Sequence, residues 1–338
     1  MRPHAITSTI HGLAPITKYL PPAVLCLGLL SAFLGRADAQ DVAWPRQTSI
    51  VVPFPPGASN DIFARILAQK LAPRLGTTIV VDNKPGAGGA IGAAYVAKST
   101  PNGATLMLTS STFTGNAAVQ PTLPFDPIAG FVPVAQLAKG PMILAVGLNT
   151  PFHTTAELLA AARAESGKLN FGTAGIGSVN HMANELLNSM AKVEMTHVRY
   201  RGISNAITDL MGGQIQVVIA SFPSIFGLLK GGQVRGLAVT SAERSPFAPE
   251  LPTIADTVPG YAAELWWGVF APAGTPGPMV ARLNGEIRAI ISEPEMRERF
   301  AQEGALPSPI AAAEFAGIVR SDLNMWRKIA EERHITAE

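Results

Sequence analysis

The polar residues of this chain that are best suited to bind a small ligand lie in two glycine-rich turns. The first turn contains Phe54, Pro55, Gly57, Ala58, Ser59 and Asn60. The second turn contains Thr173, Ala174, Gly175, Gly177 and Ser178, and His181 follows it. A strand-like run precedes each turn, and apolar residues at helical spacing follow it. Each turn is therefore predicted to lead from a strand into the N-terminus of a helix.

A helix N-terminus at each turn would supply a site for an anion. The first amides of a helix have no carbonyl partners within it, and the helix dipole places partial positive charge there. Backbone N–H groups can therefore hold a carboxylate without a lysine or an arginine. Gly57 allows a tight first turn, and Ser59 or Asn60 is predicted to cap the helix that follows.

Catalytic and metal-binding patterns are weak by comparison. The segment 57–61 resembles the G-x-S-x-G turn of a nucleophilic serine, but Asp61 occupies the last position. We interpret Ser59 as a cap or an anion donor, and a secreted hydrolase that uses Ser59 with His181 stays open as an alternative. His181 is expected to be a neutral ring in or beside a cleft, because an imidazolium would oppose the helix dipole. Without an H-E-x-x-H motif or metal-ligand spacing, no catalytic residue, metal or cofactor is assigned.

Other conspicuous residues have a structural interpretation as the simpler one. Arg199 and Arg201 lie near the end of a predicted strand and could reach a distal carboxylate, although a solvated position is commoner for an arginine. Trp266 and Trp267 are interpreted as core residues. The glycines of segment 86–92 indicate a close crossing from strand to helix that leans on the first turn, because the spacing of a dinucleotide-binding loop fails at position 91.

Composition and the N-terminal segment indicate an exported globular protein. The 338 residues are 47% hydrophobic and 15% charged, which fits a folded chain of about two domains. Arg2 and Lys18, an apolar stretch at 23–34 and a small-x-small pattern at 37–39 predict a secretory signal at residues 1–39 and a location in the periplasm. A membrane anchor is the alternative, but the apolar stretch is shorter than the roughly 20 residues that span a bilayer.

Removal of residues 1–39 would take away the only cysteine, Cys26, together with Arg2, Lys18, Arg36 and Asp38. The remaining chain carries 23 basic and 23 acidic residues. Disulfides and thiol catalysis are then excluded, and nothing in this balance indicates nucleic-acid binding. Lipid attachment at Cys26 is disfavoured because a leucine precedes it.

Strand and helix patterns alternate along the rest of the chain. Strands are predicted at 49–52, 77–82, 105–110, 141–147, 168–172, 196–200, 215–220 and 236–240. Helices are predicted at 62–75, 93–98, 156–164, 182–190, 204–211, 279–291 and 312–332, with a short piece at 294–300. This order predicts an α/β protein with mainly parallel sheets flanked by helices, and ligands of such sheets bind at the C-terminal ends of the strands. Ser110, Ser111 and Thr112 then lie at the same edge as the first turn.

The element order also predicts two lobes. The C-terminal amphipathic helices need a sheet to cover, so we expect domain 1 to comprise residues 40–142 and 263–338 and domain 2 to comprise residues 143–262. Two chain crossings, near residues 142 and 263, would act as a hinge.

Five segments, in order, resemble the Bug/TctC-type proteins, the periplasmic solute-binding components of tripartite tricarboxylate transporters. They are Val52–Asp61, Asn83–Gly89, Phe171–Ser178 with His181, Tyr200–Gly202 with Asp209-Leu210, and Ala271–Pro276 with Leu283-Asn284. The resemblance covers essentially all of residues 40–338. It implies a two-lobed type II periplasmic binding protein fold with a two-strand hinge, closing around a carboxylate-bearing ligand.

The resemblance also implies which loops bind. Segments 54–59, 110–112 and 173–178 would hold the near carboxylate with amides, hydroxyls and ordered water, and Ser221 and Phe222 would face the rest of the ligand. Asn60, His181 and Arg201 complete the set of expected ligand-binding residues. Ala58 stands where members commonly have a second glycine, so its methyl group is expected in the near pocket.

The expected function is capture of a dicarboxylate, tricarboxylate or aromatic acid by a monomeric receptor. Phe54, Phe113 and Phe222 slightly favour an aromatic or apolar ligand body. The expected partners are the permease subunits of a tripartite tricarboxylate transporter in the cytoplasmic membrane, or a sensor kinase. A sensory or scavenging protein without a transporter remains an alternative.

Overall fold

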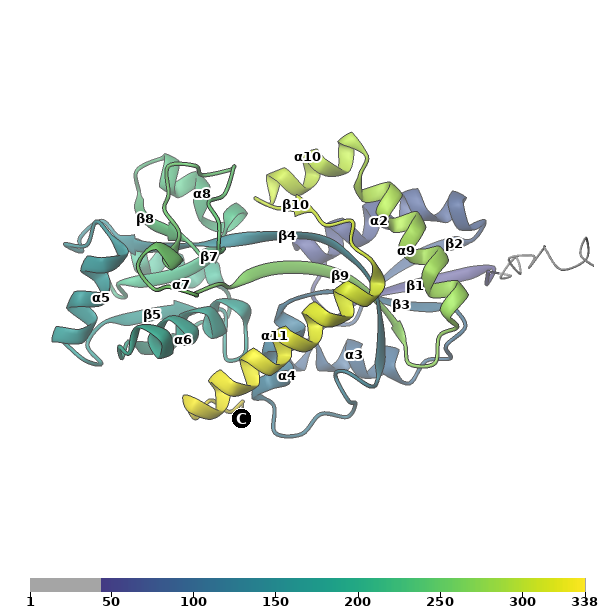
Figure 1. Ribbon diagram of the computed structural model, residues 1–338, viewed down its shortest axis with the longest axis horizontal. Helices are drawn as coiled ribbons and strands as arrows, with labels where there is room; N and C mark the ends of the chain where they lie inside the picture. Colours follow the sequence, from purple (N-terminus) through teal and green to yellow (C-terminus); the bar gives the residue numbers. More distant parts are fainter. Residues whose placement is uncertain (1–43, 338) are drawn as a thin grey trace, which may run out of the picture. The chain divides into compact units, whose positions relative to one another are not determined.

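The computed structural model describes residues 44–337 (Figure 1). The predicted signal at residues 1–39 lies outside these described residues. Within them, no helix combines the length and the apolar character that a membrane crossing requires.

Ten strands and the intervening helices follow one another in the described chain. Up to the middle of the chain the elements are β1 (Gln47–Val52), α2 (Ser59–Leu75), β2 (Thr78–Asn83), η1 (Ala87–Gly89), α3 (Ala90–Ala97), β3 (Thr105–Ser110), α4 (Thr112–Val119), β4 (Phe131–Gly147), α5 (Thr155–Ala164), β5 (Asn170–Thr173) and α6 (Val179–Ala191). The remaining elements are β6 (Thr196–Arg199), α7 (Ile203–Met211), β7 (Val217–Ser221), α8 (Phe222–Lys230), β8 (Val234–Val239), η2 (Ile254–Asp256), β9 (Glu264–Pro272), α9 (Gly277–Ile291), α10 (Pro294–Gln302), β10 (Leu306–Pro307) and α11 (Ala312–Glu332).

Every strand and helix predicted from the sequence is present within a few residues, but α4, α8, β9, β10 and the first ten residues of β4 were not predicted. Helix α4 is only 8 residues long and contains Thr112, Thr114 and Gly115, which are weak helix formers. Packing against α11 stabilises it, and the Thr114 hydroxyl is hydrogen-bonded to Asp322 of that helix. Tertiary contact therefore overrides local propensity there.

The strands form a mixed sheet in the order β2-β1-β3-β9-β4-β7-β5-β6, with β8 and β10 also paired to β4. Strands β1, β2 and β3 are parallel, and so are β5, β6 and β7. Strands β9 and β4 run antiparallel to their neighbours in between. The α/β class predicted from the sequence is confirmed, with an antiparallel centre joining two parallel halves.

Strand β4 belongs to both halves of this sheet. It pairs with β9 from Phe131 to Pro141 and with β7 and β8 from Met142 onward. The hinge position predicted near residue 142 falls at this change of pairing, and the one near residue 263 immediately precedes β9. The domain limits themselves stay a prediction.

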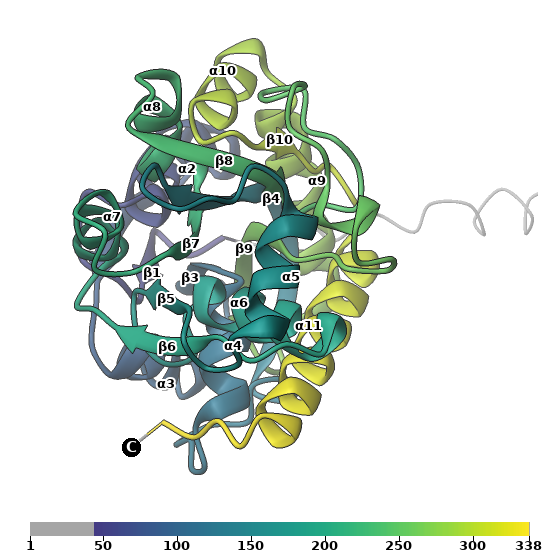
Figure 2. The same cartoon turned by 90° about the vertical axis from the view of Figure 1, so that its left-hand side faces the viewer.

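Alternation along the strands builds a core on each face of each half. In the half that contains β1, Ile50 and Val52 pack with α2 and α9 residues, whereas Val51 packs with residues of α3 and α11. In the half that contains β5, Leu144 of β4 packs with α5 and α6, whereas Ile143 packs with α7 and α8. Figure 2 shows α5 and α6 on one side of this second half and α7 and α8 on the other.

In addition to strands β4 and β9, helix α11 connects the two halves of the sheet. It packs against α4 and β4, and its residues Trp326 and Ile329 enter the core formed with α6 (Figure 1). Beyond its end, the Arg333 guanidinium binds Glu185 at 2.9 Å and Glu194 at 2.5 Å. The C-terminal segment is thereby held against the half that contains β5.

Candidate functional site

A cavity of about 1180 Å³ lies at the C-terminal ends of β1, β3, β5, β6 and β7. The rule for open α/β sheets predicts a ligand site at this edge. Residues from the start of five helices, α2, α4, α6, α7 and α8, line the cavity. Helices α2, α4 and α6 contribute residues of their first turns, whereas α7 and α8 contribute their N-cap residues, Gly202 and Ser221.

The first turn presents two amides to this cavity. Helix α2 begins at Ser59, and Ala58 is its N-cap residue, so the predicted capping by Ser59 or Asn60 is wrong. The Asp61 carboxylate accepts a hydrogen bond from the Gly57 amide at 3.0 Å, and the neighbouring Arg65 guanidinium holds the pKa of Asp61 below its usual range. The amides of Ser59 and Asn60 make no hydrogen bond within the described part of the chain. The helix start is thus fixed by Asp61, and the next amides stay available.

Ser59 has a partner of its own that the sequence did not predict. Its hydroxyl donates a hydrogen bond to Glu303 Oε2 at 2.6 Å, and burial raises the pKa of Glu303. His181 instead accepts a hydrogen bond from Gly177. Ser59 and His181 therefore do not form the nucleophile and base pair of the alternative hydrolase hypothesis.

Asn60 and the segment after β3 add polar groups at the same side. The Asn60 side chain is 8% exposed, lines the cavity and makes no hydrogen bond within residues 44–337. Ser110 and Thr112 also line the cavity. Ser111 between them is fully buried, and its amide donates to the Trp266 carbonyl.

The second turn is held by hydrogen bonds around Ser178. Its hydroxyl donates to the Gly175 carbonyl at 2.6 Å and accepts from the His181 amide at 3.4 Å, so it caps α6. The amides of Val179 and Asn180 follow the cap at the cavity wall. The repeated unit predicted from the sequence is present, with a side-chain cap in the second turn only.

Two stacked histidines, the buried His181 and the partly buried His197, support the second turn from behind. His181 Nδ1 accepts a hydrogen bond from the Gly177 amide at 3.2 Å, and burial lowers the pKa of His181 to about 3. Its ring stacks on His197, with ring centres 4.1 Å apart. His197 Nε2 lies 2.6 Å from the Thr173 hydroxyl. The pKa of His197 is lowered to about 4, mainly by burial and to a smaller extent by the positive charge of Arg199. The expected neutral His181 is thus packed behind the turn.

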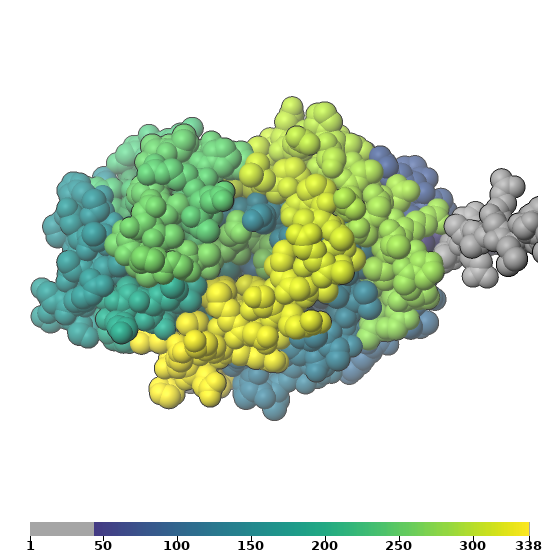
Figure 3. Space-filling view, in the orientation of Figure 1, coloured from purple at the N-terminus to yellow at the C-terminus, as the bar shows by residue number. Residues whose placement is uncertain are grey.

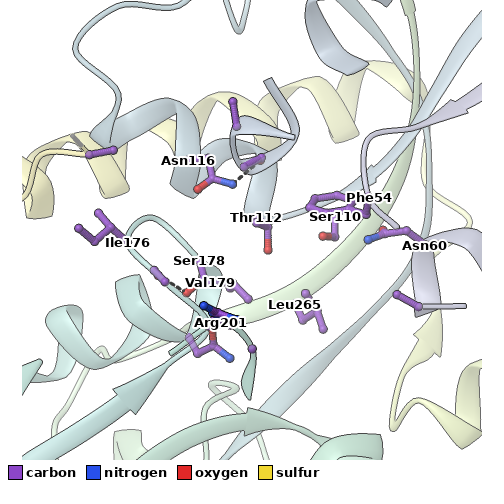
Figure 4. A pocket seen from close by; sticks show the side chains of 18 of the residues that line it. Phe54, Asn60, Ser110, Thr112, Asn116, Ile176, Ser178, Val179, Arg201 and Leu265 are labelled. Atoms are coloured by element: carbon purple, nitrogen blue, oxygen red, sulfur yellow. Dashed lines mark hydrogen bonds between the residues drawn. The ribbon is translucent and has the colours of Figure 1, made fainter. Parts of the chain in front are cut away.

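Twelve of the eighteen predicted binding residues line the cavity together. They are Phe54, Pro55, Ala58, Ser59, Asn60, Ser110, Thr112, Ala174, Gly175, Ser178, Arg201 and Ser221. Figure 4 shows Phe54, Asn60, Ser110 and Thr112 across the cavity from Ile176, Ser178, Val179 and Arg201.

The other six predicted residues are not part of the cavity wall. They are Gly57, Ser111, Thr173, Gly177, His181 and Phe222. Phe222 is 3% exposed, and its ring is so close to Gly304 that a methyl group there would lie 2.3 Å from Phe222 Cγ. This side chain therefore packs α8 against the segment after α10 and does not face the cavity.

Several lining residues were not predicted. Ala87, Gly88, Asn116, Gln120 and Ala337 come from segments remote from the two turns. The glycine-rich segment does lean on the first turn, since a methyl group on Gly89 would lie 3.5 Å from Pro53. The glycine pattern of this segment already indicated the close approach. No local pattern indicates Ala337, which reaches the cavity because its amide donates a hydrogen bond to the Val119 carbonyl.

The strands that join the halves have two different faces. On β9, Leu265 and Trp267 line the main cavity, whereas Glu264 points to a smaller hollow of about 320 Å³. Glu264 forms an ion pair with Lys139 of β4 at 3.0 Å. Figure 3 shows this hollow between the loop after β8 and the segment that follows α10. Trp267 is 2% exposed and packs edge-on against Phe63, so the interpretation as a core residue is confirmed, although its surface also reaches the cavity.

The charge at the cavity wall has one sign. Arg199 and Arg201 are the only charged residues that line it, and neither makes an ion pair or hydrogen bond within residues 44–337. In the same part of the chain no group of His, Cys, Asp or Glu side chains could hold a metal ion. Helix N-termini and two arginines together make the cavity suitable for an anion.

The fold and the cavity define a two-lobed ligand-binding protein, and comparison with known proteins identifies its family. The model of the "Tripartite tricarboxylate transporter family receptor" matches residues 63–335. The chain is 39% identical to the UPF0065 protein in the tcbD-tcbE intergenic region of Pseudomonas sp. (strain P51), covering 89% of this chain and 90% of that protein. It is 30% identical to the protein BugT of Bordetella pertussis, covering 92% and 96%.

Solved structures agree with this match. The structure of R. palustris Rpa4515 with adipate is 34% identical, with a TM-score of 0.76, and covers 87% of this chain and 99% of that chain. MatC (Rpa3494) from Rhodopseudomonas palustris with bound malate is 32% identical, with a TM-score of 0.72, and covers 85% and 99%. The chain belongs to the family of tripartite tricarboxylate transporter receptors, which contains the TctC and Bug proteins. It is a periplasmic solute-binding receptor, and the enzyme hypothesis is wrong.

Proposed function

We propose that this receptor captures a small carboxylate-bearing organic acid in the cavity between the two halves of the sheet. It then delivers the acid to the membrane permease of a tripartite tricarboxylate transporter. The observation that carries the first part is the convergence of five helix N-termini on a cavity wall that contains no Asp, Glu or Lys. Such a wall favours an anion and disfavours a cation.

One carboxylate would bind between the first turn, the segment after β3 and the second turn. The amides of Ser59 and Asn60 and the side chain of Asn60 have no other partner in the described chain. The Thr112 and Ser110 side chains lie beside them (Figure 4). A carboxylate placed there would accept hydrogen bonds from these two amides and from the Asn60 Nδ2 group, and a buried donor left unpaired costs about 1–3 kcal/mol.

Relatives support the chemical class. The structures of two relatives described above contain adipate and malate, and both compounds are small organic acids. Delivery to a permease is supported by the family to which the chain belongs. Presentation of the bound acid to a sensor kinase is the second candidate partnership.

The binding test uses residues 40–338 and pairs of ligands that differ only in charge. Each acid is compared with its carboxamide in a thermal-shift assay, followed by calorimetry. A ligand at 100 times its Kd stabilises the fold by about 2.7 kcal/mol, so binding gives a clear rise in Tm. We expect acids to raise Tm and their amides to leave it unchanged. Amides that bind as tightly as the acids would refute the anion site.

The transport test compares uptake of the bound acid in cells with and without this receptor. Loss of uptake on deletion of the receptor, with recovery on expression of the intact chain, is the expected result. Uptake that does not depend on the receptor, together with an acid-dependent change in gene expression, would favour the sensory role instead.

A further inference from the structure

A glutamate without a positive partner lies directly behind the first turn. Glu303 follows α10, and its Oε2 accepts a hydrogen bond from the Ser59 hydroxyl at 2.6 Å. Ser59 lines the cavity, whereas Glu303 is partly buried and is not part of the cavity wall. The Ser59 side chain therefore connects this carboxyl group to the place where an acid would bind.

The end of α10 fixes the position of Glu303. The next residue, Gly304, has a φ of +64°, and its amide donates a hydrogen bond to the Ala301 carbonyl. The Phe222 ring of α8 lies directly against Gly304. Figures 1 and 2 show α8 and α10 on the same side of the sheet. Glu303 is thus held at the first turn by a tight helix end that is packed against α8.

No cation balances the charge of Glu303 in the described chain. The glutamates Glu185, Glu264 and Glu293, which are also buried or partly buried, each pair with an arginine or a lysine. Glu303 forms no ion pair among residues 44–337. Burial raises the pKa of Glu303, and the hydrogen bond from Ser59 lowers it. Within the described chain, the ionised form of this carboxyl group therefore depends on one hydrogen-bond donor.

The elements that meet around Glu303 carry charged groups of their own. These groups are Asp61 and Arg65 of α2, Arg299 of α10, Lys139 of β4, and Glu243 and Arg244 of the loop after β8. The four cations among them have other partners, which are Asp61, Gln302, Glu264 and Asp256. The carboxyl group of Glu303 is therefore free to respond to a negative charge placed in the cavity.

We propose that capture of an acid at the first turn is coupled to uptake of a proton by Glu303, with the Ser59 hydroxyl as the link between the two carboxyl groups. This inference rests on the proposed function, because the acid would occupy the amides beside Ser59. While Glu303 is ionised, the hydroxyl hydrogen of Ser59 points to it, and the bound acid brings a second negative charge nearby.

A proton taken from the solvent removes this repulsion. The neutral carboxyl group can then donate a hydrogen bond to Ser59 Oγ, which leaves the hydroxyl hydrogen of Ser59 available to the acid. The receptor therefore binds acids more tightly as the pH falls, because the protonated form of Glu303 favours the bound state.

The test counts the protons that are taken up during binding. Malate, adipate and terephthalate are titrated by calorimetry in buffers of different ionisation enthalpy, between about pH 6 and pH 8.5, where carboxylic acids are ionised. The proteins are the wild type, Glu303→Gln, Ser59→Ala and the matched control Glu298→Gln. Glu298 is exposed on α10 and does not line the cavity. Glutamine can still accept the hydrogen bond from Ser59 but cannot take up a proton.

The wild type and Glu298→Gln should take up a large fraction of a proton with at least one acid. Their affinity should weaken about tenfold or more from the lowest to the highest pH, the scale of two like charges about 6–7 Å apart. Glu303→Gln should take up no proton and should keep its tight affinity at every pH. Ser59→Ala lacks the hydrogen bond that lowers the pKa of Glu303, so the pH of greatest uptake should move upward.

Binding without proton uptake by the wild type would overturn the coupling and leave the proposed function standing. Uptake that Glu303→Gln retains would assign the proton to another group and would also overturn it. An unchanged pH of greatest uptake in Ser59→Ala would exclude Ser59 as the link, and this comparison does not depend on the folding of Glu303→Gln. If none of the three acids binds the wild type, the proposed function fails, and this inference fails with it.

Discussion

The two stacked histidines behind the second turn predict how stability responds to acid. His181 has a pKa of about 3 in the folded protein because it is buried, whereas a histidine in an unfolded chain titrates near pH 6.5. Its stabilising contribution is complete above about pH 6.5 and is lost as the pH falls toward 3, because only the unfolded chain takes up the proton. Protonation would also remove the acceptor that Nδ1 offers to the Gly177 amide.

The size of the effect follows from the interval between the two pKa values. Each pH unit below the unfolded pKa costs about 1.4 kcal/mol per histidine. Lowering the pH from 7.5 to 5.0 should therefore reduce the free energy of unfolding by about 2 kcal/mol through His181, and by a similar amount through His197. Burial raises the pKa of Glu303 and Asp322, and these carboxyls act in the opposite direction. A comparison of two proteins at each pH removes their contribution.

The assay is urea unfolding of the wild type and His181→Gln at a series of pH values. Glutamine can still accept a hydrogen bond from Gly177 but cannot take up a proton. The difference in unfolding free energy between the two proteins should shift by about 2 kcal/mol in favour of the variant between pH 7.5 and 5.0. His153→Gln, which changes an exposed residue before α5, is the control and should follow the wild type. A constant difference between the wild type and His181→Gln would refute the assignment of a buried neutral ring.

Two further substitutions test contacts of the site. Ser178→Ala removes the hydroxyl that is hydrogen-bonded to Gly175 and His181. The free energy of unfolding in urea should fall by about 1 kcal/mol, and calorimetry should show a weaker affinity for the ligand. Unchanged stability would mean that the cap is dispensable. Gly304→Ala places a methyl group 2.3 Å from Phe222 Cγ at a residue with φ of +64°, so Tm should fall, and Phe222→Ala in the same chain should recover part of the loss. No recovery would assign the whole effect to the backbone conformation.

Local patterns predicted the elements and the two turns well. The helix predicted at 156–164 begins at a capping box, in which Thr154 pairs with Glu157, because both groups lie within four residues of each other. The first turn was also found from its own sequence, but its cap was assigned to Ser59 or Asn60. The structure instead uses the Asp61 carboxylate, which is fixed by Arg65 and Asn83. A partner 22 residues away is invisible to a local pattern.

The rest of the site could not be predicted because it depends on contacts between distant segments. The hydrogen bond from Ser59 to Glu303 spans 244 residues. The polar Ser111 and the aromatic Phe222 are adjacent in sequence to residues that line the cavity, but their own side chains are buried in the core. Position along the sequence therefore located the loops, whereas the three-dimensional packing decided which side chains in each loop reach the cavity.

The position of Ala337 has a practical consequence for work with the purified receptor. This residue lines the cavity in the segment that follows α11. A bulky label attached at Ala337 would lie at the wall of the binding site and compete with small acids for it. The start of strand β1 at Gln47, by contrast, does not line the cavity, and the first residue of this segment that lines it is Phe54, beyond the other end of the strand. Tags, surface immobilisation and biosensor fusions are better placed ahead of Trp44.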